Sequence, residues 1–153
     1  YSYDLDDVTF SLGHTYYTFP AADTFSKEWY AGIGFGALPL SPRLTFFYDY
    51  GDEEDGGGDG TYLSFDLSHS FTLMDDPGIS LDLGAHLGYN SKLFIRGEGT
   101  DVLLSAGVTV PLTGSLYMTP KVAYSMPFGD LEDEDDGNYD EYFYSGVSLA
   151  FTF

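Results

Sequence analysis

Eight segments of the 153-residue chain alternate apolar and polar residues with a period of two. Such alternation is typical of β-strands whose two faces meet different surroundings, and no segment has the 3.6-residue period of an amphipathic helix. The segments cover 8–19, 27–38, 43–50, 61–73, 79–90, 101–110, 116–126 and 142–153. The sequence therefore predicts one all-β domain over 1–153, with residues 1–7 as an N-terminal tail.

The composition of the two faces indicates which surroundings these strands meet. One face carries large apolar residues, and the other is mostly Gly, Ser, Thr and Tyr with few charges. A soluble barrel of lipocalin type would turn its outer face to water and would normally carry many Lys and Glu there. The segments are also close to the roughly 9–11 residues that cross a bilayer at a tilt. These features favour a closed up-and-down antiparallel transmembrane β-barrel of eight strands over the soluble alternative.

The connections between the segments alternate in length. Three are tight turns with Pro or Gly, at 39–42, 75–78 and 112–115. Three are long and polar, at 51–60, 91–100 and 127–141, and the first, at 20–26, is of intermediate length. Barrels of the bacterial outer membrane have short periplasmic turns and longer extracellular loops. The pattern therefore predicts that 51–60 and 127–141 are extracellular loops.

Both of these loops are acidic. The chain has 25 acidic and 5 basic residues and a net charge of −20, with five carboxylates in 52–59 and eight in 130–141. Nucleic-acid binding is not expected, because it requires Lys and Arg to neutralise phosphates. The first interpretation of the loops is that they are solvated tips that resist aggregation.

A second interpretation makes the chain a surface interaction module whose acidic loops bind a partner or divalent cations. The candidates for weak cation binding are Asp52, Glu53, Asp55, Asp133, Asp135 and Asp136. A specific calcium loop is not predicted, because a twelve-residue loop that starts at Glu132 would need Glu at its last position, where the chain has Phe143.

The last segment resembles the C-terminal strand of Gram-negative outer-membrane barrels, which the barrel-assembly machinery recognises as an insertion signal. The resemblance depends on an aromatic-x-Gly start, apolar residues at alternate positions and a terminal Phe, represented here by Tyr144, Gly146, Leu149, Phe151 and Phe153. It implies a location in the bacterial outer membrane, with outer-membrane lipid and the assembly machinery as partners. No signal peptide is visible at the start of the sequence.

Short motifs over most of the chain are similar to a TorF-type family of proposed porins of unknown function. They are YYTFP at 16–20, EWYAG at 28–32, FYDYG at 47–51, LGYN at 87–90, DVLLSAG at 101–107 and TPKVAYS at 119–125. These are strand-and-turn patterns rather than a chemical signature. The resemblance implies an outer-membrane location, a porin-like role and a shortened or partial member, because members of the family begin with extra strands. It supplies no catalytic residues.

Charged residues in phase with the polar face are predicted to form a polar network in the lumen, because a charge facing lipid is costly. They are Glu28, Arg43, Asp49, Asp66, Asp82, His86 and Lys121. An eight-stranded barrel has an interior just wide enough for side chains. The network is therefore expected to fill a narrow, mostly plugged lumen, and a polar path for ions or protons is the alternative interpretation.

Nothing in the sequence predicts catalysis or a bound cofactor. The chain has no Cys, which excludes a thiol nucleophile and a thiolate metal site. His86 shares a predicted strand and face with Ser80, but six residues at about 3.3 Å each place them roughly 20 Å apart, too far for activation of the hydroxyl. A lipid-modifying enzyme is therefore the least favoured interpretation, and a structural or porin-like role is the most favoured.

Overall fold

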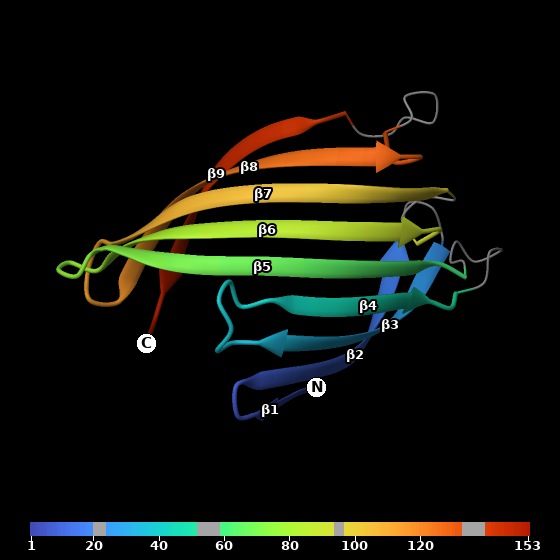
Figure 1. The fold of residues 1–153 in the computed structure, drawn as a ribbon, viewed down its shortest axis with the longest axis horizontal. Helices are drawn as coiled ribbons and strands as arrows, with labels where there is room; N and C mark the ends of the chain where they lie inside the picture. The colour runs from blue at the N-terminus through green and yellow to red at the C-terminus, as the bar shows by residue number, and fades with distance from the viewer. Residues whose placement is uncertain (20–23, 52–58, 94–96, 133–139) are drawn as a thin grey trace.

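A computed structural model describes residues 1–19, 24–51, 59–93, 97–132 and 140–153. The described residues form nine β-strands in one antiparallel sheet, in which each strand pairs with its neighbours in sequence (Figure 1). The strands are β1 (Ser2–Leu5), β2 (Val8–Phe19), β3 (Thr24–Phe35), β4 (Arg43–Asp49), β5 (Thr61–Met74), β6 (Ile79–Ser91), β7 (Glu98–Pro111), β8 (Leu116–Gly129) and β9 (Tyr142–Phe151). No helix in the described part of the chain is long and apolar enough to cross a membrane.

The prediction of an all-β, up-and-down antiparallel fold is confirmed, and the eight predicted segments correspond to β2–β9. Some boundaries differ. The segment predicted to end at residue 38 ends at Phe35, because Leu40 and Ser41 have positive φ angles of 65° and 39° and turn the chain. The loops predicted over 91–100 and 127–141 are shorter than expected, because Gly99 pairs with Gly129 and extends β7 and β8.

The N-terminal tail predicted for residues 1–7 is wrong, because β1 forms there. Its four residues pair antiparallel with residues 8–11 of β2, and Asp6 has a φ angle of 51° in the connecting turn. Asp is one of the few residues that adopt this left-handed conformation without a large steric cost. Tyr1, Tyr3 and Leu5 alternate with Ser2, Asp4 and Asp6, so the period-two pattern could have indicated this strand.

The predicted closure into an eight-stranded barrel is also wrong for the described strands, because β1 and β9 are unjoined edges of an open sheet. β1 occupies part of the β2 edge along which β9 would have to pair. The sheet is nevertheless strongly curled. In Figure 1, part of β2 and β3 pass behind β4 and β5 at one side, and β9 passes behind β5–β7 at the other. The curl gives the sheet a concave inner side and a convex outer side.

On one side of this sheet large apolar side chains are exposed, and on the other polar side chains are buried, which is the reverse of the pattern in a water-soluble protein. On β4, Leu44 and Phe46 are 42% and 46% exposed, whereas Thr45 and Asp49 are only 5% and 6% exposed. We call these sides the apolar face and the polar face. Large exposed residues of the apolar face include Leu12, Trp29, Phe46, Leu63, Phe65, Leu83, Leu87, Leu104 and Val122. Within the described ranges, the buried polar residues are Ser26, Glu28, Thr45, Asp49, Ser64 and Asn90.

Candidate functional site

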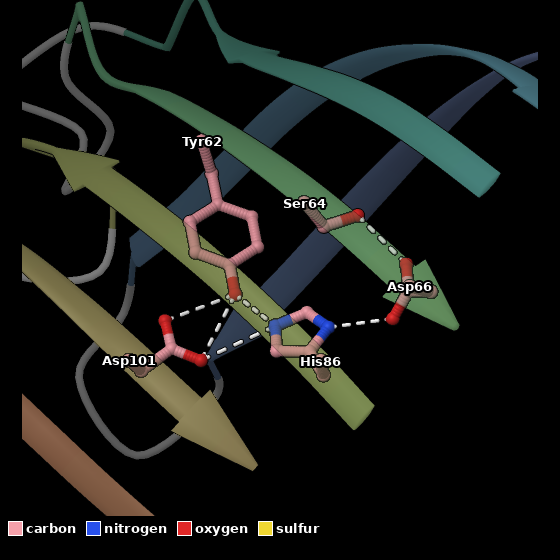
Figure 2. Close-up of polar contacts among 5 residues, drawn as sticks. All are labelled: Tyr62, Ser64, Asp66, His86 and Asp101. Atoms are coloured by element: carbon pink, nitrogen blue, oxygen red, sulfur yellow. Dashed lines mark hydrogen bonds and ion pairs between the residues drawn. The ribbon is translucent and has the colours of Figure 1, made fainter. Parts of the chain in front are cut away.

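Polar side chains from three neighbouring strands meet on the polar face and form what we call the His86 cluster. It comprises Tyr62, Ser64 and Asp66 of β5, His86 of β6 and Asp101 of β7 (Figure 2). The three residues of β5 share a face because they are two positions apart. The register then places His86 opposite Asp66, and Gly88 opposite both Ser64 and Asp101.

His86 is the centre of the cluster's hydrogen bonds. Its Nδ1 lies 2.6 Å from Asp66 Oδ1, and its Nε2 lies 2.6 Å from Tyr62 Oη and 3.2 Å from Asp101 Oδ2. The Tyr62 hydroxyl donates to Asp101, with 3.0 Å to Oδ1, and Ser64 Oγ donates to the second oxygen of Asp66 at 3.1 Å. Both histidine nitrogens therefore face oxygen atoms, and two carboxylates lie on opposite sides of one ring.

Close packing holds the cluster in place. Tyr62 is 7% exposed, and the ring of Phe47 on β4 lies 5.9 Å from the Tyr62 ring between centroids. Gly88 lies directly beneath the cluster, where an added Cβ atom would be 1.9 Å from Tyr62 Oη and 2.4 Å from Asp101 Oδ1. The contact between the Tyr62 hydroxyl and Asp101 therefore requires glycine at position 88.

Of the seven residues predicted for the lumen network, Asp66 and His86 form a direct contact. Glu28 and Asp49 are register partners on β3 and β4, and both are buried. Ser26 Oγ donates to Asp49 Oδ2 at 2.6 Å, and the Gly51 backbone N–H donates to Asp49 Oδ1 at 2.8 Å. These hydrogen bonds of the second polar group involve no residue of the His86 cluster.

The other three residues of the predicted network have different surroundings. Asp82 accepts hydrogen bonds from the hydroxyls of Ser70 at 2.6 Å, Ser80 at 3.2 Å and Thr109 at 2.6 Å. Arg43 is the register partner of Asp66, but its Nη2 donates to Ser11 Oγ at 3.1 Å. Lys121 is exposed, with Gly107 and Gly146 as its register partners.

The paired carboxylates of Glu28 and Asp49 lead to a stability prediction. Like charges directly opposite each other on neighbouring strands destabilise a sheet by roughly 0.2–1 kcal/mol. Glu28→Gln is therefore expected to raise the free energy of unfolding by that amount, as measured by urea denaturation in detergent micelles. Asp49→Asn is the contrasting variant and should be destabilising, because it weakens the bonds from Ser26 and Gly51. A loss of stability in Glu28→Gln would contradict the prediction.

The remaining predicted residues are not part of either polar group. Tyr144, Gly146, Leu149 and Phe151 lie in β9, and Phe153 follows it; all are exposed along this edge of the sheet. The weak cation candidates Asp52, Glu53, Asp55, Asp133, Asp135 and Asp136 lie outside the described residues. Within the described ranges, no group of three or more His, Asp or Glu side chains is arranged to hold a metal ion.

Three members of the His86 cluster were not predicted for the network: Tyr62, Ser64 and Asp101. All three are in phase with the polar face, so alternation could have indicated them. The contacts of Asp101 with Tyr62 and His86 depend on the register of three strands, which alternation does not give, whereas Ser64 contacts Asp66 of its own strand. The two other histidines lie on the apolar face, where His14 Nε2 is 2.7 Å from Tyr50 Oη and His69 packs against Phe71.

The geometry of the His86 cluster suits holding a proton between oxygen atoms. Ser64 hydrogen-bonds to Asp66, and no contact with His86 aligns it as a nucleophile within the described residues. Comparisons with protein-family models, with curated proteins and with solved structures found no match. The function is therefore inferred from the two faces of the sheet and from this cluster.

Proposed function

We propose that the chain forms the wall of a bacterial outer-membrane β-barrel with a structural or porin-like role. The observation that carries the proposal is the reversed polarity of the sheet. On β5, Leu63 and Phe65 are about two-fifths exposed, at 41% and 40%, while Ser64 between them is 4% exposed. A large exposed apolar surface is unfavourable in water but is the natural contact surface for lipid chains.

A membrane role also has to account for the unpaired edge strands β1 and β9. Unpaired backbone N–H and C=O groups are costly in hydrocarbon, so strands in a membrane belong to closed barrels. Adjacent strands alternate in direction, so β9 runs opposite to β2. The part of β2 beyond Leu12 is not covered by β1, whose pairing reaches residue 11. A membrane role therefore requires the edges of the open sheet to be paired in the bilayer, and this part of β2 is the segment open to pairing with β9.

The polar face then lines a narrow lumen. The His86 cluster occupies the space over β5–β7, and the rings of Tyr30, Phe47 and Tyr62 follow one another across β3–β5 with centroid separations of 5.9 Å. Side chains of this size fill most of the interior of a small barrel. We therefore propose a mostly plugged lumen that passes small solutes at most. Outer-membrane lipid and the barrel-assembly machinery are the proposed partners.

Fluorescence quenching in lipid vesicles tests this function. Trp29 is the only tryptophan, and it is 48% exposed on the apolar face. After refolding into vesicles, we expect brominated acyl chains to quench Trp29 and aqueous acrylamide to quench it weakly. Vesicles without bromine are the control. Strong acrylamide quenching, with the protein failing to float with the vesicles, would reject a membrane role. Planar-bilayer conductance of the inserted protein then distinguishes a barrel that passes ions from one that does not.

A further inference from the structure

The hydrogen bonds of the His86 cluster can be counted by donor and acceptor. Ionised Asp66 and Asp101 are acceptors only, the Tyr62 hydroxyl has one hydrogen, and a neutral imidazole has one N–H. His86 Nδ1 faces Asp66 Oδ1 at 2.6 Å, so this nitrogen must donate. A neutral ring would then have a bare lone pair on Nε2, which faces Tyr62 Oη at 2.6 Å.

A neutral His86 leaves one contact of the cluster without a hydrogen. If the Tyr62 hydroxyl donates to Nε2, it cannot donate to Asp101, whose Oδ1 lies 3.0 Å from it. Asp101 Oδ2 would also face the Nε2 lone pair at 3.2 Å. If the hydroxyl donates to Asp101 instead, two lone pairs meet between Nε2 and Tyr62 Oη. A doubly protonated imidazole removes both conflicts, because Nε2 then donates as well.

The neighbouring strands supply little competing charge. On β4, Arg43 is the register partner of Asp66, but its guanidinium donates to Ser11 of β2. On β8, Pro127 is the register partner of Asp101 and carries no ionisable group. Within the cluster, His86 pairs with Asp66 and Asp101, and one additional proton on the ring balances one of the two negative charges.

We propose that the His86 cluster is a proton-binding site, in which a proton held on His86 between Asp66 and Asp101 ties the polar side chains of β5, β6 and β7 together. The ligand is the proton, and its release leaves the Tyr62 hydroxyl to bond either His86 or Asp101. The contact between β6 and β7 side chains then opens. This inference is independent of the membrane role, because it follows from contacts within three paired strands.

Nitrogen-15 NMR of the histidine-labelled chain, folded in detergent micelles, tests the proposal. His14 and His69 provide reference signals from the apolar face, and His86→Gln assigns the third signal. At pH 7 we expect both ring nitrogens of His86 to resonate as N–H groups. One protonated and one unprotonated nitrogen at that pH would overturn the proposal.

A matched pair of variants tests the role of the carboxylate. Asp101→Asn should weaken proton binding by His86 by about tenfold, because it removes one of the two negative charges beside the ring. Ser70→Ala alters only the hydroxyls around Asp82 and should leave the His86 titration unchanged. Equal titrations in Asp101→Asn and the unmodified chain would count against the site. Failure to insert into vesicles, with the His86 signals as expected, would reject the proposed function alone.

Discussion

Leu104→Arg is expected to lower the free energy of unfolding from a lipid bilayer by about 2–4 kcal/mol, the cost of a charged side chain at the hydrocarbon midplane. Leu104 lies near the middle of β7, and it is 46% exposed on the apolar face. Its register partners Ala85 and Tyr124 are also on that face. The measurement is denaturant titration of the protein in vesicles, followed by Trp29 fluorescence.

The matched control is Leu73→Arg, which introduces the same charge near the end of β5. Leu73 is 58% exposed and precedes the turn between β5 and β6, so the arginine can reach the interfacial region. A charge near the interface costs only about 0–1 kcal/mol. If the apolar face contacts lipid, the two substitutions differ by several kcal/mol. Equal, small effects would show that Leu104 faces water.

The sequence contained enough information to predict β2–β9, because each of these strands has different surroundings on its two faces. That difference imposes the period-two pattern, which is why Leu44, Phe46 and Thr45 could be assigned to opposite faces. Residues 1–6 alternate as well, so β1 could have been predicted in the same way. The open edges could not, because alternation carries no information about which strands pair at the edges of a sheet.

The candidate site was predicted in part for a similar reason. Phase alone placed Asp66 and His86 on the polar face. Their contact depends on the register of β5 against β6, which includes an irregularity between Thr72 and Met74 near the turn. A shift by one residue would have moved His86 to the other face. The meeting of Asp101 with His86 requires the register of a third strand, so it could be found only from the structure.

Gly88→Ala is expected to destabilise the folded protein by about 1–3 kcal/mol, the usual cost of overpacking a close contact. The added Cβ atom would lie 1.9 Å from Tyr62 Oη and 2.4 Å from Asp101 Oδ1, so both groups would have to move. Their displacement also weakens the hydrogen bonds that meet at His86. Gly34→Ala is the matched control on the polar face, because its Cβ would be no closer than 3.8 Å to Arg43 Cγ.

A double-mutant cycle shows whether the cost arises at the Tyr62 hydroxyl. Tyr62→Phe removes the oxygen nearest to the new methyl group, although it also removes a donor from Asp101. The double variant should therefore lose less stability than the sum of the two single variants, because part of the steric conflict and the hydrogen bond involve the same atom. Additive losses would place the cost of Gly88→Ala at Tyr62 Cζ and Asp101 Oδ1, which would lie 2.5 Å and 2.4 Å from the added Cβ atom. Unfolding of all four proteins in detergent micelles gives the comparison, and His86 NMR signals report whether the cluster is retained.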